Sequence, residues 1–180
     1  CILDAGDLLG QGVAGGWRAR TLSLAGDQAS AETQARATLA LIERTRNEFT
    51  RKRTEGTLGS ILVAKGAYDE AITLLTPLTE GTDTMAQLFA RVELARAHLG
   101  RGDAATALAS AEATALAAGL FFAPHQASAL AVQASAQRQL GKLDDALATA
   151  QKGLKVGETS GMDVLTASVL RREELEALAA

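Results

Sequence analysis

The fold is decided by the stretch Thr54–Gly81, which reads TEGTLGSILVAKGAYDEAITLLTPLTEG. Before Gly66, apolar residues recur at helical spacing on one face, and a second apolar stripe begins at Ala71. Glycine readily adopts the left-handed conformation that ends a helix tightly, and Asp69 is expected to cap the second helix. The stretch therefore predicts two antiparallel helices joined by a short turn, which is a helical hairpin.

The same pattern occurs four times along the chain. The turn glycines, spaced by 40, 36 and 39 residues, are Gly26, Gly66, Gly102 and Gly141. Seven residues before each glycine lies a small residue, namely Ala19, Gly59, Ala95 and Ala134. Five residues after each glycine lies an alanine, namely Ala31, Ala71, Ala107 and Ala146. Self-similarity of this kind indicates a solenoid of stacked hairpins, in which facing small residues let the backbones approach closely.

We therefore predict an all-α, right-handed α-solenoid of about four helical hairpins plus a C-terminal capping helix. Helices are expected at about 7–25, 28–46, 49–65, 69–80, 84–99, 103–118, 123–140, 143–156 and 163–179. The chain would be a single domain, with repeats at about 7–46, 47–81, 83–119 and 122–160 and a cap at 162–180. A solvent-facing end of the cap is predicted from its charged run, Arg171, Arg172, Glu173, Glu174 and Glu176.

Composition narrows the class of protein. Of the 180 residues, 47% are hydrophobic but only 3% are aromatic, so a core would be built from small side chains. The net charge of −3 gives no reason to expect nucleic-acid binding. No apolar run approaches the ~18–20 residues that a membrane-spanning helix needs, so no span is expected.

The first residue, Cys1, is the only cysteine, and no initiator methionine or leader precedes it. Two interpretations follow. The chain is a fragment of a larger protein, which we favour, or Cys1 is the lipid-anchored first residue of a processed envelope protein. The first interpretation goes with a cytoplasmic location and the second with the cell envelope.

The chain resembles the tetratricopeptide repeat family. Gly59, Gly66, Tyr68 and Ala71 fall where that motif has its small residue, turn glycine, aromatic residue and alanine. In the last unit the same register gives Ala134, Gly141, Leu143 and Ala146. The spacings exceed the family's usual period of about 34 residues. Repeats of about 40 residues are similar to those of bacterial regulators of the maltose-activator type.

This resemblance implies a concave groove lined by the first helix of each repeat. One groove-facing column would contain Arg20, Ser60, Arg96 and Ser135, and two further columns would contain Arg53 and Arg138. Arginine binds carboxylates through a planar fork of donors, so an acidic protein or peptide segment is the expected ligand. Self-association through an open edge of the array is a further expectation.

No motif in the sequence predicts catalysis. Gly10–Gly15 reads GQGVAG, but the strand that a dinucleotide-binding loop requires is not predicted before it. His98 and His125 lie in no pattern of metal ligands and are expected at helix ends. Acidic pairs such as Asp69–Glu70 and Asp144–Asp145 follow turn glycines, where they would stabilise helix N-termini. We therefore expect no enzyme, no cofactor and no metal.

Two further groups of residues receive structural interpretations. The basic stretch around Arg44–Arg53 contains glutamates at spacings that favour ion pairs within a helix, so a solvated surface is expected. Phe121 and Phe122 are predicted to fill a seam between repeats, and Trp17 to anchor the core near one end of the array.

The leading functional hypothesis is a non-catalytic protein-interaction scaffold, an arm of a bacterial signalling or regulatory protein. Two alternatives remain open at this point. One is an envelope lipoprotein that scaffolds an assembly through Cys1. The other is a sensor domain of a transcriptional regulator or kinase, which a peptide or small ligand would switch.

Overall fold

The computed structural model describes residues 2–45, 47–80, 84–119, 121–160 and 163–179. In this part of the chain every regular element is a helix, which confirms the predicted all-helical fold. The elements are α1 (Ile2–Leu24), α2 (Gln28–Glu43), α3 (Glu48–Ala64), α4 (Tyr68–Leu75), the 3-10 helix η1 (Thr76–Thr79), α5 (Thr84–Gly100), α6 (Ala104–Ala118), α7 (Ala123–Gln139), α8 (Leu143–Ser160) and α9 (Val164–Leu178).

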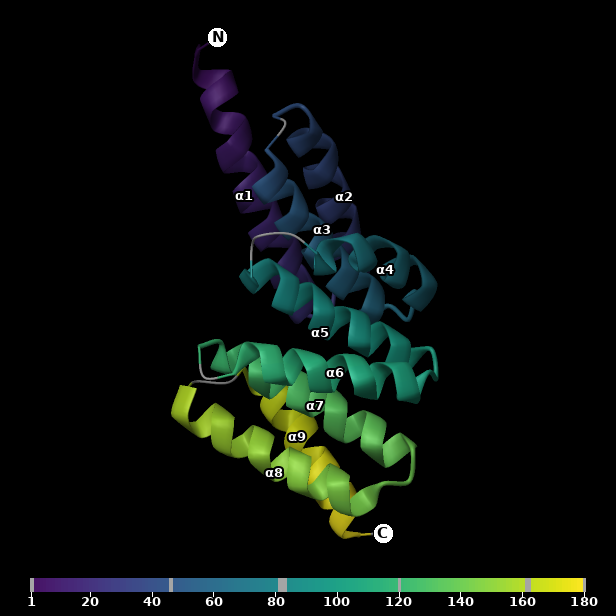
Figure 1. The fold of residues 1–180 in the computed structure, drawn as a ribbon. Coiled ribbons are helices and arrows are strands. Elements are labelled where there is room, and N and C mark those ends of the chain that lie inside the picture. Colours follow the sequence, from purple (N-terminus) through teal and green to yellow (C-terminus); the bar gives the residue numbers. More distant parts are fainter. Residues whose placement is uncertain (1, 46, 81–83, 120, 161–162, 180) are drawn as a thin grey trace.

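Each helix packs against its neighbours in the chain, and the odd-numbered helices also pack against one another. Helices α1, α3, α5, α7 and α9 thereby form one continuous layer through an elongated molecule, with α1 near one end and α8 and α9 at the other (Figure 1). Gly12 of α1 faces Thr50 of α3, and Gly16 faces Thr54, so these two helices run parallel. Such an arrangement of neighbours is that of a helical repeat.

The turns between paired helices are built as predicted. All four turn glycines have positive φ angles, between 74° and 91°. At Gly66 the glycine amide donates to the Val63 carbonyl (3.0 Å), and the Ala67 amide donates to the Leu62 carbonyl (2.9 Å). This double closure satisfies carbonyls that the end of the helix would otherwise leave without partners, and only glycine adopts the required φ without strain.

The two columns of small residues are buried, as the repeat pattern predicts. The alanines at these positions have no exposed surface, namely Ala19, Ala31, Ala71, Ala95, Ala107, Ala134 and Ala146. Gly59 is the extreme case, because an added Cβ would lie 2.4 Å from a methyl carbon of Leu75. Close approach of α3 and α4 therefore depends on the missing side chain.

Helix α4 differs from its prediction at both ends. Asp69 does not cap it: the N-cap residue is Ala67, which makes no side-chain hydrogen bond, and Asp69 lies inside the first turn. Its charge there still favours the positive end of the helix dipole. After Leu75 the chain tightens into η1, because Pro77 lacks the amide proton needed to continue an α-helix.

Two predictions about apolar residues, those for Phe121 and Trp17, are wrong. Phe121 is 94% exposed and fills no seam, while Phe122 is half-buried with its edge toward the His125 ring. Trp17 is 59% exposed and is not a core anchor. Phe121 lies in the turn before α7, and Trp17 lies on an exposed side of α1.

The expectation of a charged, solvent-facing α9 is also wrong in part. Glu173, at the centre of the charged run, is fully buried. The outer surface of α9 instead exposes Val164, Leu165, Leu175 and Leu178. Helical periodicity explains why Glu173 is buried and these apolar residues are exposed. The face of α9 that packs on α7 and α8 contains Thr166, Leu170 and Glu173.

Candidate functional site

The six residues predicted to line a groove all lie on the layer of odd-numbered helices. Their positions are Arg20 on α1, Arg53 and Ser60 on α3, Arg96 on α5, and Ser135 and Arg138 on α7. The structure divides five of them into two groups, and the sixth, Ser60, is half-buried. Arg20 and Arg53 are exposed, whereas the residues on α5 and α7 hydrogen-bond to carboxylates of the chain itself.

On α3 the predicted residues share a face with an exposed aromatic ring. Phe49, Arg53 and Ser60 lie at positions i, i+4 and i+11 of one helix, which places them on the same side. The guanidinium carbon of Arg53 lies 5.4 Å from the centre of the Phe49 ring. This cation–π contact orients the arginine while leaving its donors free, and Arg53 forms no ion pair with any described residue.

Exposed apolar residues recur at the position of Phe49 in other repeats. They lie seventeen residues before the turn glycine, and we call them the apolar row: Leu9, Phe49 and Met85. Each is exposed by two-fifths or more. Large apolar side chains are usually withdrawn from water, so exposed ones, of which Phe49 lies against the free Arg53, are typical of a surface that binds a partner.

Arg20 completes this surface on α1. Val13 and Arg20 lie at i and i+7 with Leu24 at i+11, so all three share one exposed face. Arg20 makes no hydrogen bond or ion pair within the described chain. Burial, and after it the positive charge of Arg20, lower the pKa of His125 on α7.

In the C-terminal half the predicted site residues already hold a carboxylate. Ser135 Oγ donates to Glu173 Oε1 (2.8 Å), and Arg138 Nε donates to Glu173 Oε2 (2.6 Å). Arg172 adds a third hydrogen bond (3.0 Å). Burial alone would raise the pKa of Glu173, but these three donors outweigh it and lower the pKa. The carboxylate of Glu173 on α9 thus takes up the hydrogen-bond donors of Ser135 and Arg138.

Arg96 is neither fully free nor fully engaged by carboxylates of the chain. Its guanidinium donates to Oε1 of the buried Glu93 (2.7 Å), one turn earlier on α5. Its charge also helps to lower the pKa of Asp163, against the effect of burial and together with hydrogen bonds from Thr166. Arg96 is therefore partly committed to internal carboxylates, while Ser60 of the same predicted column is half-buried.

The glycine-rich motif is part of a helix. Residues Gly10–Gly15 lie within α1, and Gly12 and Gly15 are buried against α2. A Cβ at Gly15 would lie 2.3 Å from Thr38 Oγ1, and one at Gly12 would lie 2.9 Å from Ile42. These glycines therefore permit close packing of α1 on α2.

The histidines lie at helix ends, as expected. His98 is in the last turn of α5, where burial and then the charge of Arg101 lower its pKa. His125 is in the first turn of α7. In the part of the chain that the structure describes, no cluster of three or more histidine, cysteine or acidic residues could hold a metal ion.

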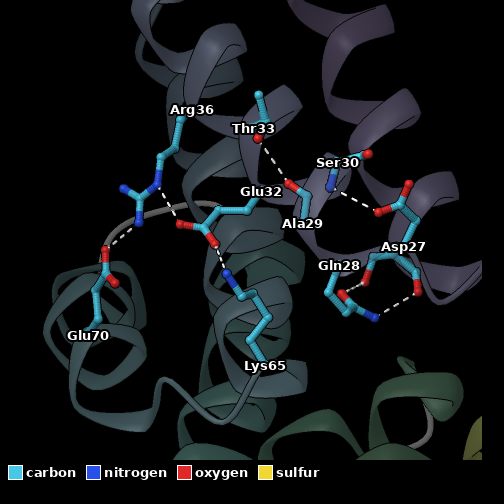
Figure 2. Close-up of polar contacts among 10 residues, drawn as sticks. Asp27, Gln28, Ala29, Ser30, Glu32, Thr33, Arg36, Lys65 and Glu70 are labelled. Atoms are coloured by element: carbon cyan, nitrogen blue, oxygen red, sulfur yellow. Dashed lines mark hydrogen bonds and ion pairs between the residues drawn. The ribbon is translucent and has the colours of Figure 1, made fainter.

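Sequence reasoning missed an ion-pair network that joins α2, α4 and the C-terminal end of α3 (Figure 2). Glu32 of α2 accepts from Arg36 (2.8 Å) and from Lys65 at the end of α3, and Arg36 reaches Glu70 of α4 (2.6 Å). The spacing of Glu32 and Arg36 could have been read as a pair, but the contacts across helices depend on packing.

The basic stretch behaves as a solvated helical surface. Arg51 pairs with Glu48 (2.5 Å) and with Glu55 on the same helix, as the spacing predicts. Both pairs lie within α3, which confirms the intrahelical pairing for Arg51. Arg53 contacts Phe49 instead, and Arg46 lies outside the described residues.

No protein-family model matches this chain, and no curated protein matches its sequence. Among the described helices, none is long and apolar enough to cross a membrane. The layer of odd-numbered helices, which we call the inner layer, is therefore the evidence from which a function is inferred.

Proposed function

We propose that this chain is a non-catalytic protein-interaction module of the tetratricopeptide type, a right-handed solenoid of four hairpins and a terminal helix. Its ligand is an acidic segment that also carries apolar side chains. The segment lies on the N-terminal half of the inner layer, over α1 and α3. In the cell we infer that the module serves as an arm of a bacterial signalling or regulatory protein.

One observation carries this proposal: Arg20 and Arg53 are exposed without acidic partners, next to exposed apolar residues such as Val13 and Phe49. Charged side chains orient the ligand and speed its association, and the apolar residues supply the area that is buried on binding. Residues 8–26 contain no acidic residue, so this surface would attract a negatively charged segment.

The C-terminal half supports the choice of ligand. There a carboxylate on a helix, that of Glu173, is bound by a serine hydroxyl and an arginine from the inner columns. Arg20 occupies the same position relative to its turn glycine as Ser135 does. An incoming carboxylate at Arg20 would therefore repeat a contact that the molecule already makes.

Binding is tested with a fluorescein-labelled peptide in which pairs of glutamates alternate with leucines. We expect saturable binding by fluorescence anisotropy that weakens with added salt, because exposed charges are screened. The double variant Arg20→Glu/Arg53→Glu should bind about tenfold more weakly, the equivalent of ~1.4 kcal/mol from two surface ion pairs.

A matched double reversal, Lys142→Glu/Lys152→Glu, controls for net charge, since both lysines are exposed and lie outside the inner layer. It should leave the affinity near that of the parent chain. A peptide with lysines in place of the glutamates should not bind. Equal binding by the arginine variant and the lysine variant would show that the inner layer is not the site.

A further inference from the structure

The inner layer contains two buried glutamates, and the chain pairs them unequally. Glu173 of α9 accepts hydrogen bonds from three side chains, two of which are arginines. Glu93 of α5 is 3% exposed and accepts one hydrogen bond from the described chain, that of Arg96 on Oε1 (2.7 Å). A buried carboxylate is stable only when its oxygens are paired, so the fold leaves Oε2 of Glu93 in need of a further donor.

This second oxygen, Oε2, is open to solvent. In the part of the chain that the structure describes, Gln137 Oε1 is the only fully enclosed side-chain oxygen or nitrogen without a hydrogen-bond partner. Oε2 of Glu93 has no partner there either, so it must reach the surface. The side chain that Glu93 does contact, Arg96, lies in the predicted groove-facing column. The opening is therefore on the face that we propose to bind the ligand.

Glu93 lies at the seam between α3 and α5. These helices run in the same direction, because α4 between them returns the chain (Figure 1). An added Cβ at Gly56 of α3 would lie 3.4 Å from the ring of Phe89 on α5. One helical turn beyond this contact, Ser60 of α3 comes level with Glu93 of α5. Ser60 is half-buried, and its hydroxyl makes no hydrogen bond to a described residue.

The seam between α7 and α9 shows how such a glutamate is completed. There Ser135 and Arg138 of α7 donate to Glu173. Relative to their turn glycines, these two residues occupy the positions that Ser60 and Val63 occupy on α3. The serine is thus repeated at the seam between α3 and α5, but a valine replaces the arginine. This seam therefore has the carboxylate and the serine of the contact but lacks its cation.

Charge favours a cation over a neutral donor at this position. Burial raises the pKa of Asp163, the N-cap residue of α9, while hydrogen bonds from Thr166 and the charge of Arg96 lower it. One guanidinium therefore compensates the charge of two carboxylates, those of Glu93 and Asp163. A neutral amide would satisfy Oε2 of Glu93 but leave the excess negative charge, whereas an ammonium or guanidinium group would remove both deficits.

We propose that Glu93 binds a lysine or arginine side chain of the partner segment, at a subsite formed with Ser60 and Val63 on the seam between α3 and α5. The segment is then of mixed charge, because its carboxylates bind Arg53 and its cation binds Glu93. This inference rests on the function proposed above, since it concerns the same ligand. Arg53 precedes Ser60 by seven residues, or about 10 Å along α3. An extended segment covers that distance in about three residues.

Fluorescence anisotropy with paired peptides tests the subsite. Each pair keeps the glutamates and leucines of the peptide used above and differs at one position, where one member has lysine and the other glutamine. In one pair this position lies three residues after a glutamate, and in the other pair three residues before it. The parent chain should bind the lysine member of one pair about tenfold more tightly than the glutamine member, because close charge pairs at an interface couple strongly.

The variant Glu93→Gln should bind the lysine and glutamine peptides equally well. Glu112→Gln is the matched control, because Glu112 is exposed on α6, and it should keep the preference of the parent chain for lysine. Binding of all peptides by the parent chain with equal affinity would overturn the subsite and leave the proposed function standing. Failure of every peptide to bind would contradict the proposed function instead.

An arginine introduced into the chain tests the subsite without a peptide. Val63→Arg should place a guanidinium at Glu93, as Arg138 places one at Glu173. In urea unfolding, Val63→Arg should therefore raise the midpoint more, or lower it less, beside Glu93 than in the Glu93→Gln background. An equal effect in both backgrounds would show that the two side chains do not interact, which overturns the subsite.

The same variant provides a binding test that does not require Glu93→Gln to fold. Because its own guanidinium would fill the subsite, Val63→Arg should bind the lysine and glutamine peptides equally. Circular dichroism checks that each variant is helical. A preference for lysine that persists in folded Val63→Arg would mean that the peptide cation binds elsewhere.

Discussion

At the scale of single residues, Glu173 does the most to attach the last helix. Its side chain has no exposed surface, and its carboxylate accepts hydrogen bonds from Ser135, Arg138 and Arg172. A buried charge is tolerated only when it is fully paired, because its desolvation is otherwise too costly. The contact between α7 and α9 therefore depends on an ionised glutamate that the sequence pattern places on the surface.

We expect Glu173→Gln to lower the free energy of unfolding by about 1–3 kcal/mol at pH 7, since buried donors lose a charged acceptor. The folded-state pKa of Glu173 is lowered, so its contribution is fully present above the unfolded pKa and is lost as pH falls through the folded pKa. The difference between parent and variant should therefore shrink below about pH 4.

Urea unfolding at pH 7 and at pH 3.5 or so measures both effects. Glu158→Gln is the control, because Glu158 is exposed on α8, and it should change stability by no more than about 0.5 kcal/mol. A pH-independent difference for Glu173→Gln would mean that the carboxylate charge is not what attaches α9.

At the scale of helices, the small columns set the distance between the two members of each hairpin. Ala71→Leu and Ala146→Leu should each cost about 1–3 kcal/mol, because both alanines are fully buried and added methyl groups would overpack the crossing. Thermal and urea unfolding measure the cost. Ala113→Leu, at an exposed position of α6, should be close to neutral. Parental stability of both buried variants would contradict the assigned register.

Most helix boundaries could be predicted because their signals are local. A turn glycine and an apolar stripe identify a helix end without knowledge of the neighbours, and the positive φ angles at Gly26, Gly66, Gly102 and Gly141 confirm this. The exceptions also have local causes that the pattern did not resolve. Helix α4 starts at Tyr68, before the expected cap Asp69, and Pro77 converts its last turn into a 3-10 helix.

The candidate site was less predictable because it depends on contacts distant in sequence. The repeat register placed Arg20, Arg53, Arg96 and Arg138 on the inner helices, but it could not show which of them have internal partners. Arg138 is occupied only because α9 docks on α7 and brings Glu173 to it. Arg20 and Arg53 remain free because no acidic side chain of the described residues reaches them.

At the scale of the whole molecule, a layered array distributes stability unevenly. Each helix contacts only near neighbours, so the free energy of opening should follow local burial. Helix α7 has nine buried residues along its length, between Ala127 and Gln137, whereas α9 has only Thr166, Leu170 and Glu173. The two ends of the layer are thus expected to open more readily than its centre.

Native-state hydrogen exchange tests this distribution. Amides in α5 and α7 should exchange slowest, and those of α9 faster, by sub-global opening that leaves the central helices intact. Glu173→Gln should speed exchange in α9 while leaving α5 nearly unchanged, because the lost contacts join α9 to α7 alone. If α9 and α7 amides exchange at one common rate in both proteins, the array unfolds as a single unit and its ends are not separately unstable.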